Sequence, residues 1–297
     1  MKTKVGKYLS RILAILLGGL ILGAFWFWPI CSSFFHYLIW RVTTGAVIEK
    51  DYVRAGDADI HFVSYGRGPS VLLLHGGLSN RLSWFAQLPW LVVSGRRVVV
   101  PDTRGHGLSG LGEGGLSYRR LAADAVAILD RLGIAQTDVV GWSDGGNTAL
   151  LLALGWPRRV RRMVVISANF NPAGLTPEAH RDTFEASRGL TYWLRRWWTG
   201  AGDRLRALEA RIKRMWRMRP NLQLADLAKM GAPTLVIVGE KDVVSLAHAR
   251  QMAEALGHGT LAIVPGGHFT PVTHARRVNA LIAAFLGIEK PTFKGSG

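Results

Sequence analysis

The sequence predicts a doubly wound α/β domain with a mostly parallel sheet. After Arg41, strand-like and helix-like segments alternate, as they do in parallel sheets whose strands are joined by helices. Two of the strand-like runs, residues 71–74 and 236–238, are continuously apolar, which is typical of strands that are covered on both faces. The chain has 297 residues, of which 48% are hydrophobic, and this is enough to build a large buried core.

The individual elements follow from these patterns. Strands are expected at residues 60–64, 71–75, 97–101, 137–142, 162–168, 234–239 and 260–264. Helices are expected at residues 82–93, 118–132, 144–154, 246–256 and 272–285. Residues 170–222 break the alternation, because they are helical in composition and rich in tryptophan and arginine. We interpret them as an insertion after a strand of one domain, residues 42–297, and not as a second domain.

The N-terminal region, residues 1–41, differs from the rest of the chain. Residues 12–30 are almost wholly apolar, and about 20 helical residues suffice to cross a bilayer core of ~30 Å. The sequence therefore predicts one transmembrane helix that anchors the protein in the cell membrane as a single-pass protein, in contact with membrane lipid. The basic residues before this segment favour an extracytoplasmic location for the remaining domain. These are Lys2, Lys4, Lys7 and Arg11.

Two other interpretations of this segment stay open. A cleaved signal peptide is one, although its apolar region would be shorter, about 7–15 residues. A buried helix of the soluble core is the other, although such a helix would show a polar face and this segment has none.

Charge and cysteine content restrict the other classes of function. Lysine and arginine total 37 against 20 acidic residues, a formal net charge of +17, which predicts attraction to anionic surfaces. No nucleic-acid partner is expected, because no nucleic-acid-binding module accompanies the charge. The single cysteine, Cys31, excludes an internal disulfide and a multi-cysteine metal site.

One motif carries chemistry. Residues 141–145 read Gly-Trp-Ser-Asp-Gly and fit G-x-S-x-G, between a strand-like run and a helix-like run. In that setting a sharp turn exposes the serine hydroxyl, and flanking glycines are needed because a Cβ would crowd the turn. We therefore identify Ser143 as the candidate nucleophile.

A nucleophilic serine needs a base, and the base needs an orienting carboxylate. Asp242 follows the strand-like run at 234–239, and His268 follows the run at 260–264. Both lie after the carboxyl ends of strands, where open α/β sheets build their sites. Glu240 is the alternative acid, while His75 and His106 are alternative bases that precede the serine.

A second glycine turn provides candidate oxyanion donors. The apolar run 71–74 leads into His75-Gly76-Gly77-Leu78. The backbone N–H groups of Gly77 and Leu78 are expected to act with that of Asp144, the residue after the nucleophile.

With these motifs the sequence resembles the α/β-hydrolase superfamily, in its serine-triad branch. The matching segments are HGG at 75–77, PDTRGHGLS at 101–109, GWSDGG at 141–146, GEKD at 239–242 and GGH at 266–268. GWSDGG is most similar to the biphenyl hydrolase-like (valacyclovir hydrolase) esterases. The resemblance implies that Ser143 is the nucleophile, His268 the general base and Asp242 its partner, and that residues 170–222 form a lid over the site.

The resemblance implies a serine hydrolase that cleaves esters of small or lipid-derived acyl substrates, and no metal or organic cofactor, since the triad needs none. Trp142 and Asp144 are the candidate substrate-binding residues. The Asp144 carboxylate is either a stabilising acid in the first helical turn or a counter-charge for a cationic substrate. Alternatives are C–C bond hydrolysis or perhydrolysis on the same triad, and a non-catalytic, membrane-tethered binding protein. Epoxide hydrolase and dehalogenase activities are disfavoured, because their families carry aspartate where Ser143 stands.

Overall fold

The structure is a computed structural model that describes residues 28, 30–182 and 189–288. The chain divides into two compact units, residues 1–44 and 45–297, whereas the sequence placed the boundary after residue 41. In the first unit, residues 30–43 are helical. Within this helix the rings of Tyr37 and Trp40 lie 6.1 Å apart, and the Thr44 hydroxyl donates to the Trp40 carbonyl at 2.7 Å.

The predicted location in the cell membrane requires correction. A spanning helix needs about 20 consecutive apolar residues. Among the residues that the structure describes, no helix is long and apolar enough to span a bilayer. The segment 12–30 on which the prediction rested lies outside the described residues, apart from Trp28 and Ile30. The single-pass location and the extracytoplasmic placement of the domain therefore do not stand.

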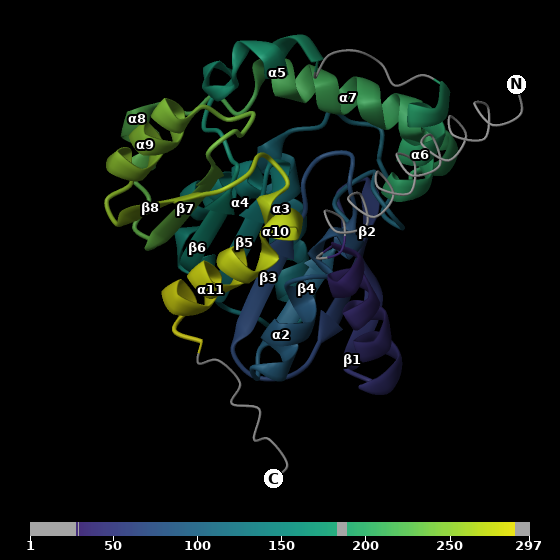
Figure 1. Ribbon diagram of the computed structural model, residues 1–297. Coiled ribbons are helices and arrows are strands. Elements are labelled where there is room, and N and C mark those ends of the chain that lie inside the picture. Colours follow the sequence, from purple (N-terminus) through teal and green to yellow (C-terminus); the bar gives the residue numbers. More distant parts are fainter. Residues whose placement is uncertain (1–27, 29, 183–188, 289–297) are drawn as a thin grey trace, which may run out of the picture. The chain divides into compact units, whose positions relative to one another are not determined.

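The second unit is built on one sheet, whose described strands run in the order β1-β2-β4-β3-β5-β6-β7-β8 (Figure 1). The strands are β1 (Val47–Ala55), β2 (Ala58–Tyr65), β3 (Ser70–Leu74), β4 (Arg97–Pro101), β5 (Thr137–Trp142), β6 (Val160–Ile166), β7 (Thr234–Gly239) and β8 (Gly259–Val264). β2 pairs antiparallel with both β1 and β4, and all other pairs are parallel. The carboxyl ends of the parallel strands therefore meet at one edge.

Helices cover both faces of this sheet. They are α2 (Leu88–Val93), α3 (Tyr118–Arg131), α4 (Asp144–Gly155), α9 (Leu246–Ala255), α10 (Thr270–Thr273) and α11 (Ala275–Leu286), with single 3₁₀ turns η1 (Arg81–Trp84) and η2 (Pro157–Arg159). α2 and α11 lie in front of the sheet in Figure 1, and α3 and α4 lie behind it. The apolar faces of α3, α4 and α9 bury one continuous core against the strands. The predicted α/β-hydrolase fold with a mostly parallel sheet is confirmed.

The segment between β6 and β7 is helical, as expected. It contains η3 (Pro172–Gly174), α5 (Pro177–Asp182), α6 (Gly189–Thr199), η4 (Gly202–Arg204), α7 (Leu205–Met218) and α8 (Leu224–Leu227). The Leu222 N–H donates to the Phe170 carbonyl at 2.9 Å, so the two ends of the insertion meet at the edge of the sheet. α7 buries an apolar face that includes Leu208 and Ile212 against Leu78.

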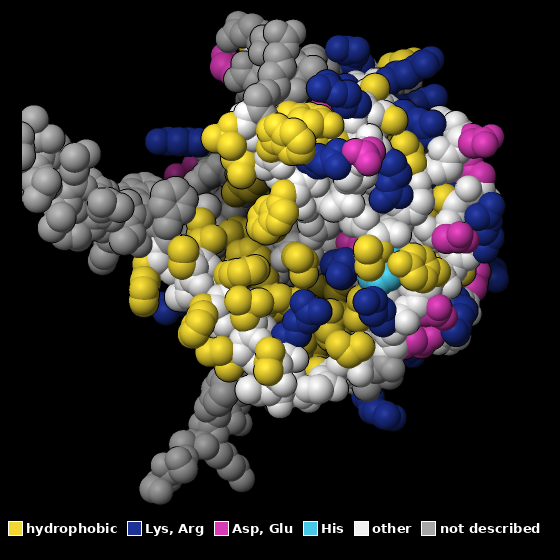
Figure 2. Space-filling view, turned by 90° about the vertical axis from the view of Figure 1, so that its right-hand side faces the viewer, with side chains coloured by type: hydrophobic (Ala, Val, Ile, Leu, Met, Phe, Trp, Pro, Cys, Tyr) yellow, Lys and Arg dark blue, Asp and Glu magenta, His cyan; other side chains and the backbone are white. Residues whose placement is uncertain are grey.

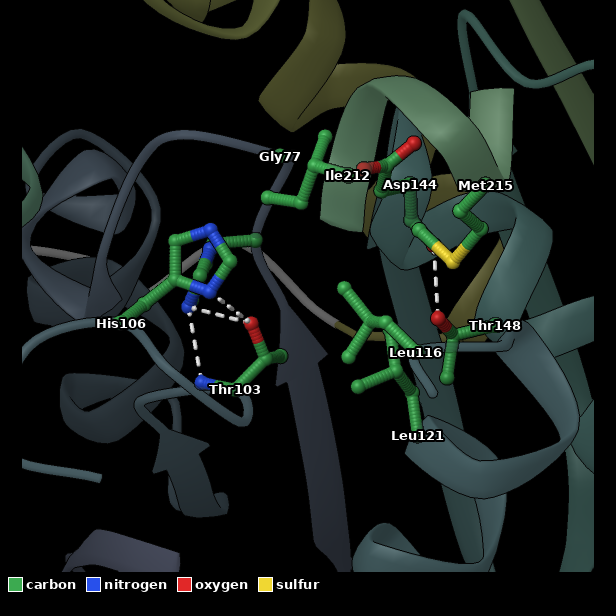
Figure 3. Close-up of a pocket in the computed structure, with 10 residues that line it drawn as sticks. Gly77, Thr103, His106, Leu116, Leu121, Asp144, Thr148, Ile212 and Met215 are labelled. Atoms are coloured by element: carbon green, nitrogen blue, oxygen red, sulfur yellow. Dashed lines mark hydrogen bonds between the residues drawn. The ribbon is translucent and has the colours of Figure 1, made fainter. Parts of the chain in front are cut away.

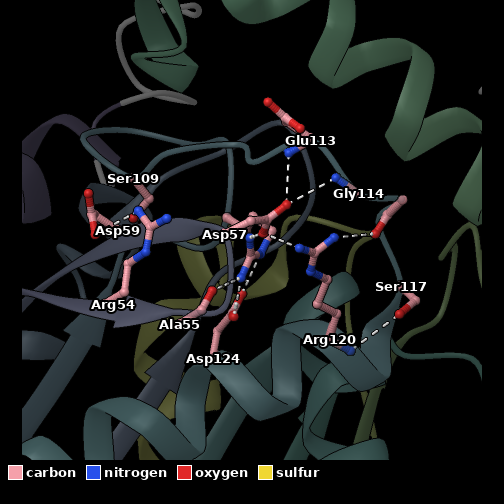
Figure 4. Close-up of polar contacts among 12 residues, drawn as sticks. Arg54, Ala55, Asp57, Asp59, Ser109, Glu113, Gly114, Ser117, Arg120 and Asp124 are labelled. Carbon is pink, nitrogen blue, oxygen red and sulfur yellow. Dashed lines mark hydrogen bonds and ion pairs between the residues drawn. The ribbon is translucent and has the colours of Figure 1, made fainter.

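A network of charges fixes the loop that follows β4 (Figure 4). The buried Arg104 guanidinium donates to both carboxylate oxygens of Asp124, at 2.9 and 2.6 Å, and to Asp57 at 2.6 Å. Arg120 also donates to Asp57. Because Asp57 lies in the turn between β1 and β2, the network ties this turn to α3 and to the loop. Arg104 is therefore part of the scaffold, with its charge neutralised by paired carboxylates.

The remaining basic residues are mainly on the surface. Figure 2 shows Lys and Arg side chains scattered among hydrophobic and neutral ones, while acidic side chains gather mainly toward one side of that view. Arg104 and Lys213 are the basic side chains buried among the described residues.

Candidate active site

Ser143 lies in a sharp turn between β5 and α4. Its backbone has φ 56° and ψ −121°, outside the regions that side-chain-bearing residues favour. The Ser143 N–H donates to the Ile166 carbonyl at 2.8 Å, which ties the turn to the neighbouring strand β6. The predicted strand–turn–helix setting of the serine is present, and the hydroxyl stands at the amino end of α4.

The glycines of the motif are needed because backbone segments approach closely here. A Cβ added to Gly141 would lie 2.3 Å from the Gly145 carbonyl oxygen, and one added to Gly145 would lie 1.9 Å from the Leu74 carbonyl oxygen. Neither position has positive φ, so close packing, and not backbone conformation, selects glycine.

Replacing Gly145 by alanine should lower the free energy of unfolding by about 3 kcal/mol, because the new methyl group meets rigid backbone. Gly155, at the other end of the same helix, is the matched control, since a Cβ there meets nothing within 4 Å. Gly155→Ala should be neutral or stabilise the fold by about 0.5 kcal/mol. Urea denaturation measures both variants, and equal effects would contradict the steric explanation.

The three predicted triad residues come together at the carboxyl edge of the sheet. His268 Nε2 lies 3.0 Å from Ser143 Oγ, and His268 Nδ1 lies 2.9 Å from Asp242 Oδ1. Asp242 follows β7 and His268 follows β8, as the strand pattern predicted. This is the hydrogen-bonded order of nucleophile, base and orienting carboxylate that nucleophilic catalysis requires.

Asp242 is held as a carboxylate by several donors. Burial raises its pKa, but the hydrogen bonds from His268, Ser167 and the Gly239 N–H outweigh this effect, so the pKa lies below its usual value. The Val244 N–H also donates to Asp242, at 3.3 Å. Ser167 was not among the predicted site residues. Its position directly after β6, next to the β5–α4 turn, was the available signal.

The oxyanion turn, residues 75–78, is fixed by two buried histidines. The Thr103 N–H donates to His75 Nε2 at 2.9 Å, so His75 carries its proton on Nδ1 and donates to the Gly76 carbonyl at 2.8 Å. Burial lowers the pKa of His75, and it lowers the pKa of His106 to about 3. Both rings are therefore neutral, and they hold the turn without acting as the base.

One of the three predicted oxyanion donors is engaged elsewhere. The Leu78 N–H donates to His106 Nε2 at 3.0 Å, so it points away from the nucleophile. Leu78 has a φ of 54°, which is unusual for a residue that carries a side chain. A Cβ added to Gly76 would lie 3.8 Å from Ser143 Oγ, so the turn borders the serine. Gly77 and Asp144 remain as the candidate donors.

A small cavity lies behind the oxyanion turn (Figure 3). His106 and Thr103 face it from one side, Leu116 and Leu121 from another, and Ile212 and Met215 from α7. It has room for about one water molecule. Gly77 and Asp144, the two candidate oxyanion donors, also line it, whereas Ser143 and His268 do not. In the described part of the chain, no cluster of His, Cys, Asp and Glu is arranged to hold a metal ion.

The two predicted substrate-binding residues are buried. Trp142 is 5% exposed, and its indole N–H donates to the His268 carbonyl at 2.9 Å, which supports the loop that carries the histidine. Asp144 is 6% exposed and accepts hydrogen bonds from the Tyr118 hydroxyl at 2.7 Å and from the Trp216 indole N–H at 2.8 and 2.9 Å. Both side chains are engaged in hydrogen bonds within the protein.

Burial raises the pKa of Asp144 to about 6, against the opposing effects of hydrogen bonds from Tyr118 and Trp216 and of the charge of His268. A raised pKa means that the folded state favours the neutral form of the Asp144 side chain. The protein is therefore stabilised by the protonated side chain below about pH 4, and this stabilisation is lost as the pH rises through about 6.

The variant Asp144→Asn cannot ionise at this position. The difference in free energy of unfolding between this variant and the unmodified protein should therefore shift in favour of the variant by about 2 kcal/mol between about pH 4 and pH 7. Urea denaturation at both pH values measures this difference. A difference that does not change with pH would show that Asp144 does not titrate in this range.

Comparison with known proteins agrees with the fold. Residues 69–196 match the family described as alpha/beta hydrolase fold. The serine hydrolase BPHL of Mus musculus is 28% identical over 267 residues, which cover 82% of this chain and 88% of the relative. The 2-hydroxymuconate semialdehyde hydrolase of Pseudomonas sp. (strain CF600) is 29% identical over 263 residues, which cover 74% of this chain and 88% of the relative.

A solved structure is also similar. The meta-cleavage product hydrolase of Pseudomonas fluorescens IP01 superposes with a TM-score of 0.69 at 23% identity, covering 80% of this chain and 97% of that protein. At this identity the likeness establishes a shared fold.

Proposed function

The chain belongs to the α/β-hydrolase superfamily and is a hydrolase of that fold, and from this premise we propose that it is a serine hydrolase acting on carboxylic esters. The observation that carries the proposal is the continuous hydrogen-bonded chain from Ser143 through His268 to Asp242 at the carboxyl edge of the sheet. The similarity to the mouse serine hydrolase supports it.

In the proposed reaction, Ser143 Oγ attacks the ester carbonyl while His268 Nε2 takes the hydroxyl proton. Asp242 stabilises the imidazolium that forms, and the N–H groups of Gly77 and Asp144 donate to the oxyanion. His268 then protonates the leaving alcohol, which leaves an acyl group on Ser143. A water molecule, activated by the same histidine, releases the acid and restores the serine.

An apolar substrate fits the surroundings of His268. The neighbouring Phe269 is 63% exposed, and its ring packs edge-on against Trp142 with centroids 5.6 Å apart. An exposed aromatic ring next to the base offers a surface to an acyl chain or to an apolar leaving group. We propose that the substrates are small or lipid-derived esters, and that residues 170–222 act as a lid over them.

C–C bond hydrolysis is the second candidate, because the Pseudomonas relative that is 29% identical is named for hydrolysis of 2-hydroxymuconate semialdehyde. The purified protein should be assayed with p-nitrophenyl acetate, butyrate and octanoate, and in parallel with 2-hydroxymuconate semialdehyde. A kcat/KM for the best ester at least about tenfold above that for the semialdehyde supports ester hydrolysis. The reverse order would assign C–C bond hydrolysis instead.

A further inference from the structure

We propose that Asp144 and Trp216 form a latch that fastens helix α7 to the oxyanion turn and thereby positions the Gly77 N–H for catalysis. Both are positioning residues, since neither side chain touches the reacting atoms. The inference rests on the proposed ester hydrolysis. It adds that full activity requires the contact between Trp216 of the helical insertion and Asp144 of the catalytic domain.

The latch is a buried carboxylate held by two neutral donors. The Trp216 indole N–H reaches both oxygens of Asp144, at 2.8 and 2.9 Å, and the Tyr118 hydroxyl reaches Oδ1 at 2.7 Å. Across residues 30–182 and 189–288, no lysine or arginine forms an ion pair with Asp144. A buried carboxylate without a basic partner depends strongly on each hydrogen bond that it accepts.

The carboxylate and the indole both lie directly against the oxyanion turn. A Cβ placed on Gly77 would be 2.2 Å from Asp144 Oδ2 and 2.9 Å from Trp216 Cζ2. Gly77 is therefore in van der Waals contact with both members of the latch. A change in the position of either one changes the surface on which the peptide of Gly77 rests.

The rest of α7 supplies apolar packing and a further hydrogen-bonded contact, in which Arg211 donates to the Gly112 and Gly114 carbonyls at 2.7 and 3.0 Å. That contact does not involve the oxyanion turn. Leu205, Leu208 and Ile212 are buried against Leu78 and Leu111. Dispersion and burial hold the helix on the domain, but they do not fix its position along the surface as a hydrogen bond does. We infer that packing and the Arg211 contact keep α7 on the domain, and that the latch sets the position of the Trp216 end of the helix relative to Gly77.

Four variants test this inference. Trp216→Phe removes the indole donor, and Asp144→Ala removes the acceptor. Asp144→Asn keeps one acceptor oxygen and is the conservative variant. Trp197→Phe is the matched control, because Trp197 lies in the same insertion on α6 and is 78% exposed.

With p-nitrophenyl butyrate, Trp216→Phe and Asp144→Ala should each lower kcat by about tenfold, because small displacements of an oxyanion donor are costly, while KM changes by less than about threefold. Inhibition by a trifluoromethyl ketone, whose adduct carries an oxyanion, should weaken by the same factor as kcat. Asp144→Asn should regain most of the kcat lost in Asp144→Ala, and Trp197→Phe should behave as the unmodified protein.

Two results would overturn the latch. A loss of thermal stability with unchanged kcat would mean that the contact is only structural. A change confined to KM would mean that α7 acts on substrate binding and not on the oxyanion turn.

Failure of the proposed ester hydrolysis can be distinguished from failure of the latch, because in the first case the unmodified protein itself would hydrolyse no ester. In that case the hydrogen bond between Trp216 and Asp144 is detected by NMR, from the proton resonance of the Trp216 indole N–H. The resonance is assigned to Trp216 because it is absent from the spectrum of Trp216→Phe. This resonance should move upfield in Asp144→Ala, and an unchanged shift would refute the contact.

Discussion

Replacing Ser143 by alanine should lower kcat for p-nitrophenyl butyrate by about 10⁴- to 10⁶-fold, leaving the rate that binding and the oxyanion donors provide. The hydroxyl is the proposed nucleophile, and it lies 3.0 Å from its side-chain partner, His268 Nε2. Because the change removes one oxygen and retains the Cβ, the fold should be preserved.

Ser70→Ala is the control for this change. Ser70 begins β3, at the amino end of the strand and far from the turn that holds Ser143, and its hydroxyl donates to the Gln136 carbonyl at 3.2 Å. This variant should change kcat by less than about twofold, as surface substitutions usually do. Ester turnover by Ser143→Ala within a few-fold of the unmodified protein would exclude Ser143 as the nucleophile.

Asp242→Asn should lower kcat by about 10³- to 10⁴-fold. The structure supplies the reason, because Ser167 and the Gly239 N–H both donate to Oδ2. In the variant, the asparagine oxygen must take the place of Oδ2 to accept these two hydrogen bonds. The amide NH₂ group then takes the place of Oδ1 and faces His268 Nδ1. The imidazole must then carry its proton on Nε2, and it cannot accept the proton of Ser143.

Glu240→Gln is the matched control for the carboxylate. Glu240 is two residues away and exposed, and its N–H pairs with the Val264 carbonyl in the sheet, independently of its side chain. The variant should change kcat by less than about twofold. If Glu240→Gln were the more damaging change, the orienting carboxylate would be Glu240 and the hydrogen bond between Asp242 and His268 would be incidental.

The central part of the fold was predictable because its strands carry apolar runs that are buried. β3 and β7 were recognised from the continuous apolar runs at residues 71–74 and 236–238, and these residues are buried in the structure. β1 was not recognised, because this edge strand carries charges along the sequence VIEKDYVRA and is half exposed. The predicted helix at residues 272–285 is two helices, α10 and α11, since the chain leaves helical geometry at His274.

The triad was predictable for a related reason. Ser143, Asp242 and His268 each follow a strand, and parallel strands bring their carboxyl ends to one edge. Leu78 was predicted as a donor from its place in the glycine turn, but its N–H donates to His106 Nε2. Local sequence does not specify that hydrogen bond, because His106 lies 28 residues further along the chain.

Trp216 could not be predicted as a partner of Asp144. The two residues are 72 positions apart, and the indole reaches the carboxylate only because α7 folds back over the oxyanion turn. A tryptophan among arginines in a helical insertion has many possible environments. Only the packing of the insertion against the domain determines which one it takes.

Fluorophosphonate labelling followed by peptide mass mapping tests the central claim most directly. The probe phosphonylates an activated serine, and it should modify the full-length protein once, on the peptide that carries Ser143. Labelling should be lost in Ser143→Ala and strongly slowed in Asp242→Asn, because the nucleophile is absent in the first and its base is in the wrong tautomer in the second. A folded protein that stays unlabelled, or that is labelled at another serine, would contradict the assignment of Ser143, His268 and Asp242 as a catalytic triad.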